Sequence, residues 1–300
     1  MPLRTDLALE SVYTHQNDGI QKKIEQKKEC TVTRIEITTE EASQLVEKPM
    51  GNFITLELEK NLGVDPDSIE NLAQILAEEI RKLLPEVKGR ILVVGLGNRM
   101  ITPDALGPDT MERIMVTNHA MQYLQEGGNG DFSPVSAICP GVLGITGIET
   151  AEIVKGVVER YQPSVVIAVD ALCARTPKRM FRTLQLTDTG IHPGSGVGNR
   201  RDGLNQESLG VPVIAVGVPT VVDSDCIVHT AISRFFEANN SLEEAGNMIG
   251  DMMKYTEGEM FVSPKDIDNL IAKSARVIAG GINLALHKNI DLTFSENFVS

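Results

Sequence analysis

The chain has 300 residues, of which 42% are hydrophobic and 23% are charged, a composition that suits a folded domain with a substantial core. Its formal net charge of −13 repels phosphate backbones and argues against direct binding of nucleic acid. No stretch approaches the roughly 20 apolar residues of a membrane span, and the first residues lack an apolar signal segment. We therefore expect a cytoplasmic protein with no membrane segment.

The cysteine and histidine positions give no metal-binding pattern. The four cysteines form no CxxC pair, and the five histidines form no HExxH or HxH spacing. Ligands brought together from distant parts of the chain would leave no such pattern. We expect free thiols, no bound metal and no cofactor.

The N-terminal part is predicted to begin with an arm and to continue with two strands. Residues 1–28 are polar without clear periodicity, which predicts an extended arm followed by a charged segment. Alternation with a period of two predicts strands at 30–37 and 51–59, with a short helix between them. Asp65 and Pro66 then begin a helix that runs to residue 84 with apolar residues at helical spacing.

From residue 90 the pattern changes to buried strands that alternate with helices. Strands are expected at 90–98, 135–139, 164–170, 180–186 and 211–219, and helices at 104–124, from 146 and at 223–237. A last helix is expected at 263–287, interrupted by Gly280 and Gly281. Residues 239–258 are expected to be mostly loop. The alternation predicts a single three-layer α/β domain over residues 29–300 with a mostly parallel sheet. The N-terminal strands either extend that sheet or form a small subdomain.

Two glycine-rich stretches resemble known motifs but depart from them. GLGN (95–98) follows a strand as a dinucleotide-binding loop does, but Met100 stands where the third glycine is needed, so we expect only a tight turn. HPGSGVGN (192–199) places Ser195 between glycines without the spacing or the following helix of a nucleophile elbow. We expect a flexible loop there that shapes a cleft, with His192 and Arg200 available to a substrate.

Two aspartates follow the ends of predicted buried strands. Asp104 lies in TPDALGP, where it could also be only a helix-start residue. Asp170 ends SVVIAVD, where an ionised carboxylate is costly unless backbone amides or Arg175 satisfy it. If the two strands are neighbours, both side chains converge on one cleft outside the carboxyl ends of the strands. Two close carboxyl groups share a proton, so that one takes a proton from water while the other polarises a peptide carbonyl.

Residues near these motifs are candidates for contacts with a substrate. They are Asn98, Thr102, Glu149, Arg175, His192 and Ser195. Several also have a purely structural interpretation, such as helix capping by Thr102. Asp223 and Asp225 are expected to cap a helix, with a role in the cleft as the alternative.

Several long motifs of the chain resemble the spore germination protease family. They are VVGLGN, TPDALGP, PGVLGITGIET, IAVDALCAR, DTGIHPGSGVGN, GVPVIAVGVPTVVD, and MFVSPKDID with AGGINLALH. The resemblance spans nearly the whole chain. It implies a homotetrameric endopeptidase of the spore core, made as a zymogen, that degrades small acid-soluble spore proteins during germination. It also implies a fold similar to that of hydrogenase maturation proteases.

The resemblance further implies roles for single residues. The two aspartates held essential in the family match Asp104 and Asp170. RTDLALE (4–10) is similar to the family's self-processing site, with the cut between Asp6 and Leu7 after a leader of residues 1–6; the alternative is that these are simply tail residues. The family has been catalogued both as metallo and as aspartic, and the lack of a metal-ligand pattern favours the aspartic type. A metal-dependent peptidase on the same scaffold and a non-catalytic binder of spore proteins remain alternatives.

Overall fold

The structure, a computed structural model, describes residues 5–12, 17–62, 66–86, 89–121, 131–194, 202–238 and 260–299. The predictions for Ser195, Arg200 and the segment 239–258 lie outside these ranges, as do residues 1–4 of the predicted leader. Within them, no helix combines the length and apolar character needed to cross a bilayer.

Strands and helices alternate along most of the chain, as the sequence pattern predicts. The described elements are α1 (Ala8–Val12), β1 (Ile20–Gln26), β2 (Cys30–Ile37), α2 (Glu40–Val46), β3 (Gly51–Leu58), α3 (Pro66–Leu83), β4 (Ile91–Gly95), η1 (Thr102–Asp104), α4 (Leu106–Met111), η2 (Asn118–Ala120), β5 (Val135–Ile138), α6 (Leu143–Thr146), α7 (Thr150–Tyr161), β6 (Val165–Ala174), η3 (Pro177–Arg179), β7 (Thr183–Thr187), α8 (Gln206–Leu209), β8 (Val213–Asp223), α9 (Ser224–Ala238), β9 (Phe261–Val262), α11 (Ile267–Leu286) and α12 (Leu292–Val299). Helix α12 was not predicted from the sequence.

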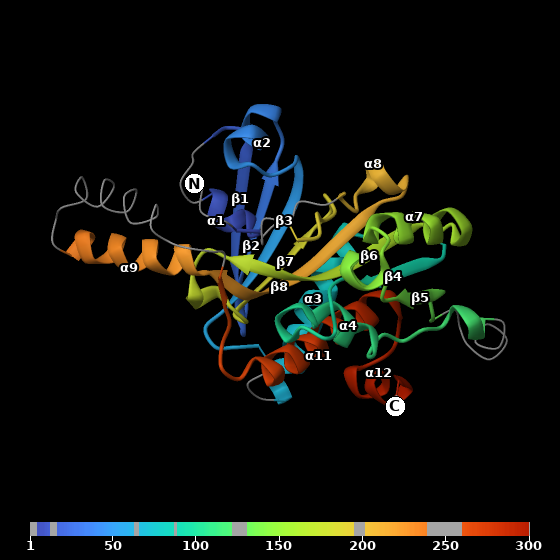
Figure 1. The fold of residues 1–300 in the computed structure, drawn as a ribbon. Coiled ribbons are helices and arrows are strands. Elements are labelled where there is room, and N and C mark those ends of the chain that lie inside the picture. The colour runs from blue at the N-terminus through green and yellow to red at the C-terminus, as the bar shows by residue number, and fades with distance from the viewer. Residues whose placement is uncertain are drawn as a thin grey trace.

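The described strands form one mixed sheet in the order β1-β2-β3-β7-β8-β6-β4-β5, with β9 paired to β8 (Figure 1). Strands β8, β6, β4 and β5 run parallel to one another. The pairs β1–β2, β2–β3, β3–β7, β7–β8 and β8–β9 are antiparallel. The prediction of a mostly parallel sheet is therefore wrong. The N-terminal strands extend the sheet, and they join it through antiparallel pairing with β7.

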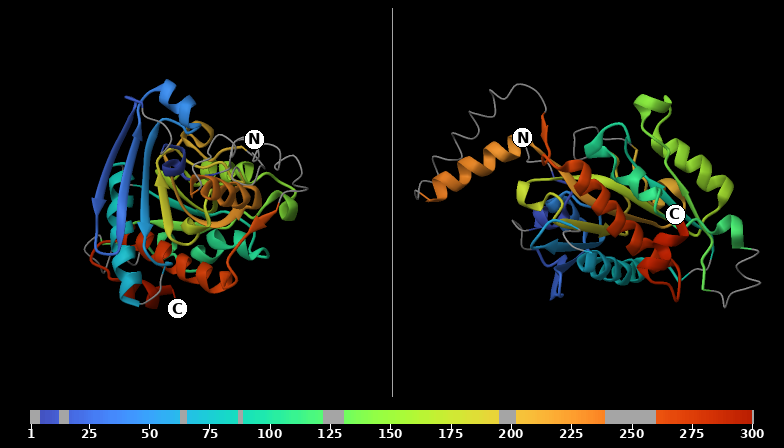
Figure 2. Two further views of the ribbon diagram at one scale, coloured as in Figure 1. Left: turned by 90° about the vertical axis from the view of Figure 1, so that its left-hand side faces the viewer. Right: turned by 90° about the horizontal axis from the view of Figure 1, so that it is seen from below.

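Helices cover both faces of the sheet, which gives three layers (Figures 1 and 2). The first face packs against α3, α4 and α11, and the second face against α7 and α8, with α1 and α2 over β2 and β3. Alternation along β6 separates the two sides: Ile167 and Val169 belong to the first core, whereas Val166 and Ala168 belong to the second. The side chain of Asp170 therefore lies on the second face.

The predicted N-terminal arm contains regular structure. Residues 20–26 form the edge strand β1, and residues 8–12 form α1. Strand β1 is largely exposed, so its polar residues give no alternation that would predict a strand. Its backbone pairs with β2 along its whole length, from Ile20 opposite Ile37 to Gln26 opposite Thr31.

The helix expected over residues 104–124 is much shorter. Helix α4 ends at Met111 because the chain then turns to run beside β5. Thr117 and Val135 exchange hydrogen bonds there: the Thr117 amide donates to the Val135 carbonyl, and the Val135 amide donates to Thr117 Oγ1 at 3.0 Å.

Glycines do not interrupt the C-terminal helix, contrary to expectation. They lie where α11 crosses α3: an added Cβ at Gly281 would come 2.6 Å from the Leu76 side chain, and one at Gly280 would come 3.3 Å from Ala73. The missing side chains let the two helices approach closely.

A third glycine brings α4 against the ends of two central strands. An added Cβ at Gly107 would lie 2.1 Å from the carbonyl oxygen of Leu96 and 2.7 Å from that of Val169. These are backbone atoms, which cannot move aside as a flexible side chain can. Because Val169 directly precedes Asp170 and α4 directly follows the turn of Asp104, this contact sets the distance between the two aspartates.

We predict that Gly107→Ala lowers the free energy of unfolding by about 1–3 kcal/mol, as overpacking of a dense core does. The matched control is Gly156→Ala in α7, where nothing lies within 4 Å of an added Cβ. Because alanine favours a helix over glycine, the control should gain about 0.5–1 kcal/mol. Urea unfolding measures both, and equal effects of the two substitutions would contradict the steric explanation.

Candidate active site

A cavity of about 860 Å³ lies beyond the carboxyl end of β4, beside the middle and C-terminal parts of β6 and β8, and extends along β7. Its wall includes Gly97 and Asp104 after β4, residues 170–173 of β6, Gly217 of β8 and Gln185 of β7. Open α/β sheets bind ligands at this edge. The volume is large enough for a small ligand or a short peptide segment.

Asp170 reaches the cavity from within β6. Its residue is 6% exposed, and the amide of Ala171 donates a hydrogen bond to its Oδ1 at 2.9 Å. On the neighbouring strand β8 the residue in register is Gly217, which has no side chain. The side chain of Leu172 packs over this glycine, since an added Cβ at Gly217 would lie 2.6 Å from Leu172 Cγ.

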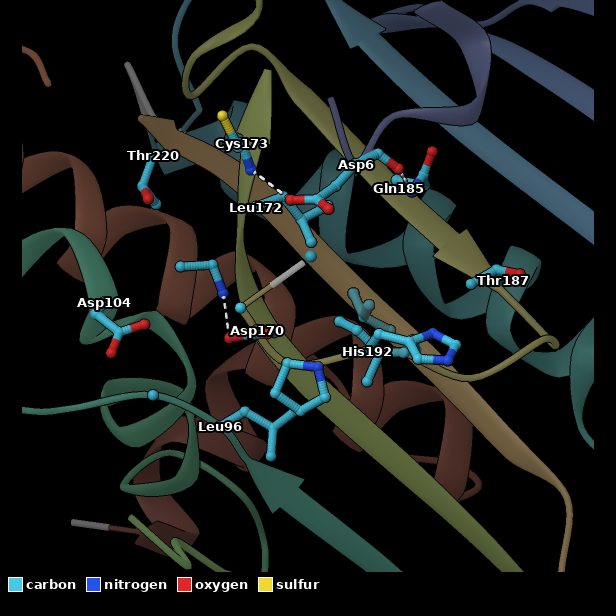
Figure 3. A pocket seen from close by; sticks show the side chains of 18 of the residues that line it. Asp6, Leu96, Asp104, Asp170, Leu172, Cys173, Gln185, Thr187, His192 and Thr220 are labelled. Atoms are coloured by element: carbon cyan, nitrogen blue, oxygen red, sulfur yellow. Dashed lines mark hydrogen bonds between the residues drawn. The ribbon is translucent and has the colours of Figure 1, made fainter. Parts of the chain in front are cut away.

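Asp104 enters the same cavity from the turn after β4 (Figure 3). The backbone amide of Asn98 donates to Asp104 Oδ2 at 2.7 Å, and Gly97 passes so close that an added Cβ would lie 2.1 Å from the Asp104 carbonyl oxygen. Gly97 adopts a φ of 107°, which favours glycine. Thr220 Oγ1 donates to the Pro103 carbonyl at 2.7 Å and so fastens the turn to β8.

The environment of Asp170 favours the protonated acid. Burial raises its pKa well above the usual value, and the negative charges of Asp104 and Asp6 raise it further. The hydrogen bond from the Ala171 amide opposes these effects but is the smallest of them. The two aspartates thus interact electrostatically, as a pair that shares a proton must.

The N-terminal segment lies in this cavity and pairs with the end of β6. The amide of Asp6 donates to the Cys173 carbonyl at 2.9 Å, and the Cys173 amide donates to Asp6 Oδ2 at 2.8 Å (Figure 3). The side chain of Leu7 is fully buried in an apolar cluster with Leu172, Ala174, Val222 and Cys226. The bond between Asp6 and Leu7 is therefore held on both sides.

The carboxylate of Glu10 is bound further along the same segment. The Arg175 amide donates to its Oε2 at 2.8 Å, and Arg179 Nε forms an ion pair with its Oε1 at 3.2 Å. Thr5 Oγ1 also donates to Glu10 Oε2, so the segment folds back on itself. Leu7, Ala8 and Leu9 between them are all fully buried.

Two further polar side chains contact the backbone of the segment. Lys48 Nζ lies 3.1 Å from the Thr5 carbonyl oxygen and 3.3 Å from that of Asp6. Gln185 Nε2 donates to the Asp6 carbonyl at 3.0 Å, while its Oε1 accepts from the Ala8 amide at 2.7 Å. The carbonyl group of Asp6 therefore faces two donors.

The structure brings together some of the predicted site residues. Asp104, Asp170, Asp6 and His192 all line the cavity, and Leu7 is buried next to it. The described lining does not include the other candidates, although Arg175 contacts Glu10 through its backbone amide and, from Nη1, the Glu10 carbonyl at 3.4 Å. Asn98 contributes its amide to Asp104; Thr102 begins η1 without capping it; Glu149 precedes α7.

Sequence reasoning missed Lys48, Gln185 and Arg179, and it included Glu10 only as the last residue of the RTDLALE motif. A usable signal exists for Gln185: it alternates with the apolar Leu184 and Leu186 on a strand that is otherwise buried, so it had to face a polar site. No comparable signal marks Lys48, which lies in the loop between α2 and β3.

Within the described ranges, no group of three or more His, Cys, Asp or Glu side chains is placed so that it could hold a metal ion. The fold and the cavity define a class of protein, an α/β protein with two interacting carboxyl groups in a cleft beside its parallel strands. Such a pair can perform acid–base hydrolysis.

Comparison with known proteins agrees with that class. The sequence profile of the germination protease family matches residues 5–239. The germination protease of Clostridium perfringens (strain 13) is 39% identical over 325 residues, covering 99% of each chain. Those of Caldanaerobacter subterraneus and Bacillus cytotoxicus are 43% and 38% identical, each covering 96% of this chain and 95% of the relative. The chain belongs to the germination protease family and is a peptidase.

The raised pKa of Asp170 predicts a pH dependence of stability. Between the ordinary Asp pKa of about 3.9 and the raised pKa in the fold, the folded state binds more protons than the unfolded state, so stability falls as pH rises. Asp170→Asn keeps an acceptor for the Ala171 amide and removes this titration. We predict that the variant gains stability relative to the wild type as pH rises from 4 to 8, measured by urea unfolding at each pH.

The matched control is Asp268→Asn, an exposed aspartate on α11. The difference in free energy of unfolding between Asp268→Asn and the wild type should stay constant across the same pH range. A constant difference for Asp170→Asn as well would contradict the raised pKa.

Proposed function

We propose that this chain is an endopeptidase of spore germination that cuts small acid-soluble spore proteins with Asp104 and Asp170. The observation that carries the proposal is that two interacting carboxyl groups share one cavity with a bound stretch of polypeptide. Membership of the germination protease family supports the reaction class. The substrate rests on the family resemblance of the sequence motifs. The homotetramer, the location in the spore core and the likeness to hydrogenase maturation proteases belong to the same proposal and rest on the family resemblance alone.

The mechanism follows from the protonation of the pair. The buried Asp170 carboxyl favours the protonated form, and the half-buried Asp104 supplies the ionised partner. The ionised carboxylate takes a proton from water as the water oxygen attacks the peptide carbonyl carbon. The protonated carboxyl then gives its proton to the leaving nitrogen, the C–N bond breaks, and a carboxyl and an amino product result.

Self-processing between Asp6 and Leu7 is part of the proposal. The segment around this bond runs through the cavity, pairs with Cys173 and buries Leu7, which is how a peptide substrate would bind. A zymogen would carry its own first substrate in this position. The bound Glu10 carboxylate then indicates what else is recognised: an acidic residue four positions after the first residue of the bond.

We predict that Asp104→Asn and Asp170→Asn each lower kcat by about 10²–10⁴-fold, the usual contribution of an acid or base. The assay uses a synthetic peptide spanning residues 4–12, with the products identified by mass spectrometry. Asp268→Asn should retain wild-type activity. Peptide cleavage that survives both substitutions would refute the two-aspartate mechanism.

The same assay separates the alternatives. Exhaustive chelation should leave activity unchanged in the aspartic mechanism, whereas a metal-dependent peptidase would lose activity and regain it when the metal is returned. A non-catalytic binder would bind spore proteins without cutting them and would be indifferent to both Asp→Asn substitutions.

We also predict a specific effect of the acidic side chain bound by Arg179. Replacing glutamate by glutamine at the Glu10 position of the peptide should lower kcat/KM about ten-fold, because a charge-assisted contact of about 1.5 kcal/mol is lost. In Arg179→Met the same peptide change should have little further effect. Arg182→Met, at an exposed arginine bonded to Asn61, is the control and should show the wild-type preference. An undiminished preference in Arg179→Met would refute the assignment.

A further inference from the structure

Lys48 is an unusual component of this cavity. Its residue is half-buried, and its ammonium group points at two backbone carbonyls, those of Thr5 and Asp6. Burial lowers the pKa of Lys48, the carboxylates of Asp6, Glu10 and Glu47 raise it in turn, and Arg175 lowers it slightly. Burying the ammonium group costs hydration free energy, although a neutral donor could make the same two contacts.

Gln185 binds two successive peptide units of the same segment. Its amide nitrogen donates to the Asp6 carbonyl and its amide oxygen accepts from the Ala8 amide. These two bonds have opposite polarity, so the side chain binds the backbone in one orientation only. The Asp6 carbonyl oxygen is held between the ammonium group of Lys48 and the amide of Gln185.

The sheet register relates this carbonyl to the aspartates. Gly217 of β8 is in register with Asp170 of β6 on one side and with Gln185 of β7 on the other. The side chains of Asp170 and Gln185 face the same cavity, two strand spacings apart, which is about 9–10 Å between backbones. Leu172 packs over the glycine between them, and Leu172 and Asp6 also line the cavity that Asp170 and Gln185 share.

We propose that Lys48 and Gln185 form the oxyanion site of this peptidase, the pair of donors that binds the carbonyl oxygen of the bond being cut. This inference rests on the proposed function. As the water oxygen bonds to the carbonyl carbon, the C=O electron pair moves onto the oxygen, which becomes negative. Lys48 and Gln185 stabilise that charge, and it returns to re-form C=O when the C–N bond breaks. The two aspartates move the protons, so neither donor has to give one up.

A role in stabilising the transition state explains why a cation lies here, whereas holding the segment in place would need only a neutral donor. An attractive charge gains most when the oxygen becomes fully negative, so its contribution is larger in the transition state than in the bound substrate. An anchor would instead contribute equally to both states and would affect KM. The two roles can therefore be separated by kinetics.

The test measures kcat and KM for cleavage of the peptide spanning residues 4–12 by the full-length chain. Lys48→Met keeps the length of the side chain and removes its charge, and Gln185→Met removes the amide. We expect each to lower kcat, by about 10²–10³-fold for Lys48→Met, with KM changed only several-fold. Lys48→Arg, which keeps the charge, should recover part of the loss. Lys28→Met removes a lysine whose side chain is 81% exposed and should have no effect.

Thermal unfolding of every variant accompanies the kinetics, and Gln185→Met decides the question if Lys48→Met does not fold. A rise in KM at unchanged kcat would show that the residues only anchor the segment and would overturn the proposal. Failure of Lys48→Arg to exceed Lys48→Met would overturn the role of the charge. If the wild-type chain cuts no peptide at all, the proposed function fails; if the wild type and Lys48→Met cut equally, only the oxyanion site fails.

Discussion

The cavity depends on keeping one carboxyl group out of water. Asp170 lies on a strand whose residues 165–169 pack into the two cores of the sheet and whose Leu172 and Ala174 pack around Leu7, and its own side chain is buried at the wall of the cavity. Desolvation makes its ionised form costly, and the nearby charges of Asp104 and Asp6 add to that cost. An apolar residue at this position would pack without this desolvation cost. The close contact of Gly107 with both strand ends then keeps the second carboxyl group in reach.

The mixed topology of the sheet gives the cavity its second wall. Parallel β6 supplies Asp170 from its middle, and the turn after the parallel strand β4 supplies Asp104. Antiparallel β7 places Gln185 opposite them, and the loop after α2 supplies Lys48. A purely parallel sheet would end at β8 and would leave the peptide unit of Asp6 without these donors. The N-terminal strands thus take part in the site and do more than enlarge the sheet.

The sequence predicts the aspartates better than it predicts their surroundings. Long apolar runs identify the buried strands, and an aspartate at the end of such a run is anomalous enough to be noticed. The direction of the added strands could not be predicted, because β1 is too exposed to alternate and β3 pairs with a strand some 130 residues later. Lys48 could not be predicted either, because an isolated lysine after a short helix is common on a protein surface. Its contacts with the backbone of the N-terminal segment are visible only in the folded structure.

The burial of Leu7, Ala8 and Leu9 has a consequence for competition. These residues remain attached to the sheet through β1 even when the bond before Leu7 is broken, so they stay in the neighbourhood of the groove. A segment that stays covalently attached to the protein competes for its binding site at a high effective concentration. Another polypeptide must displace residues 7–9 to reach the aspartates. Binding of that polypeptide therefore requires a high concentration of it.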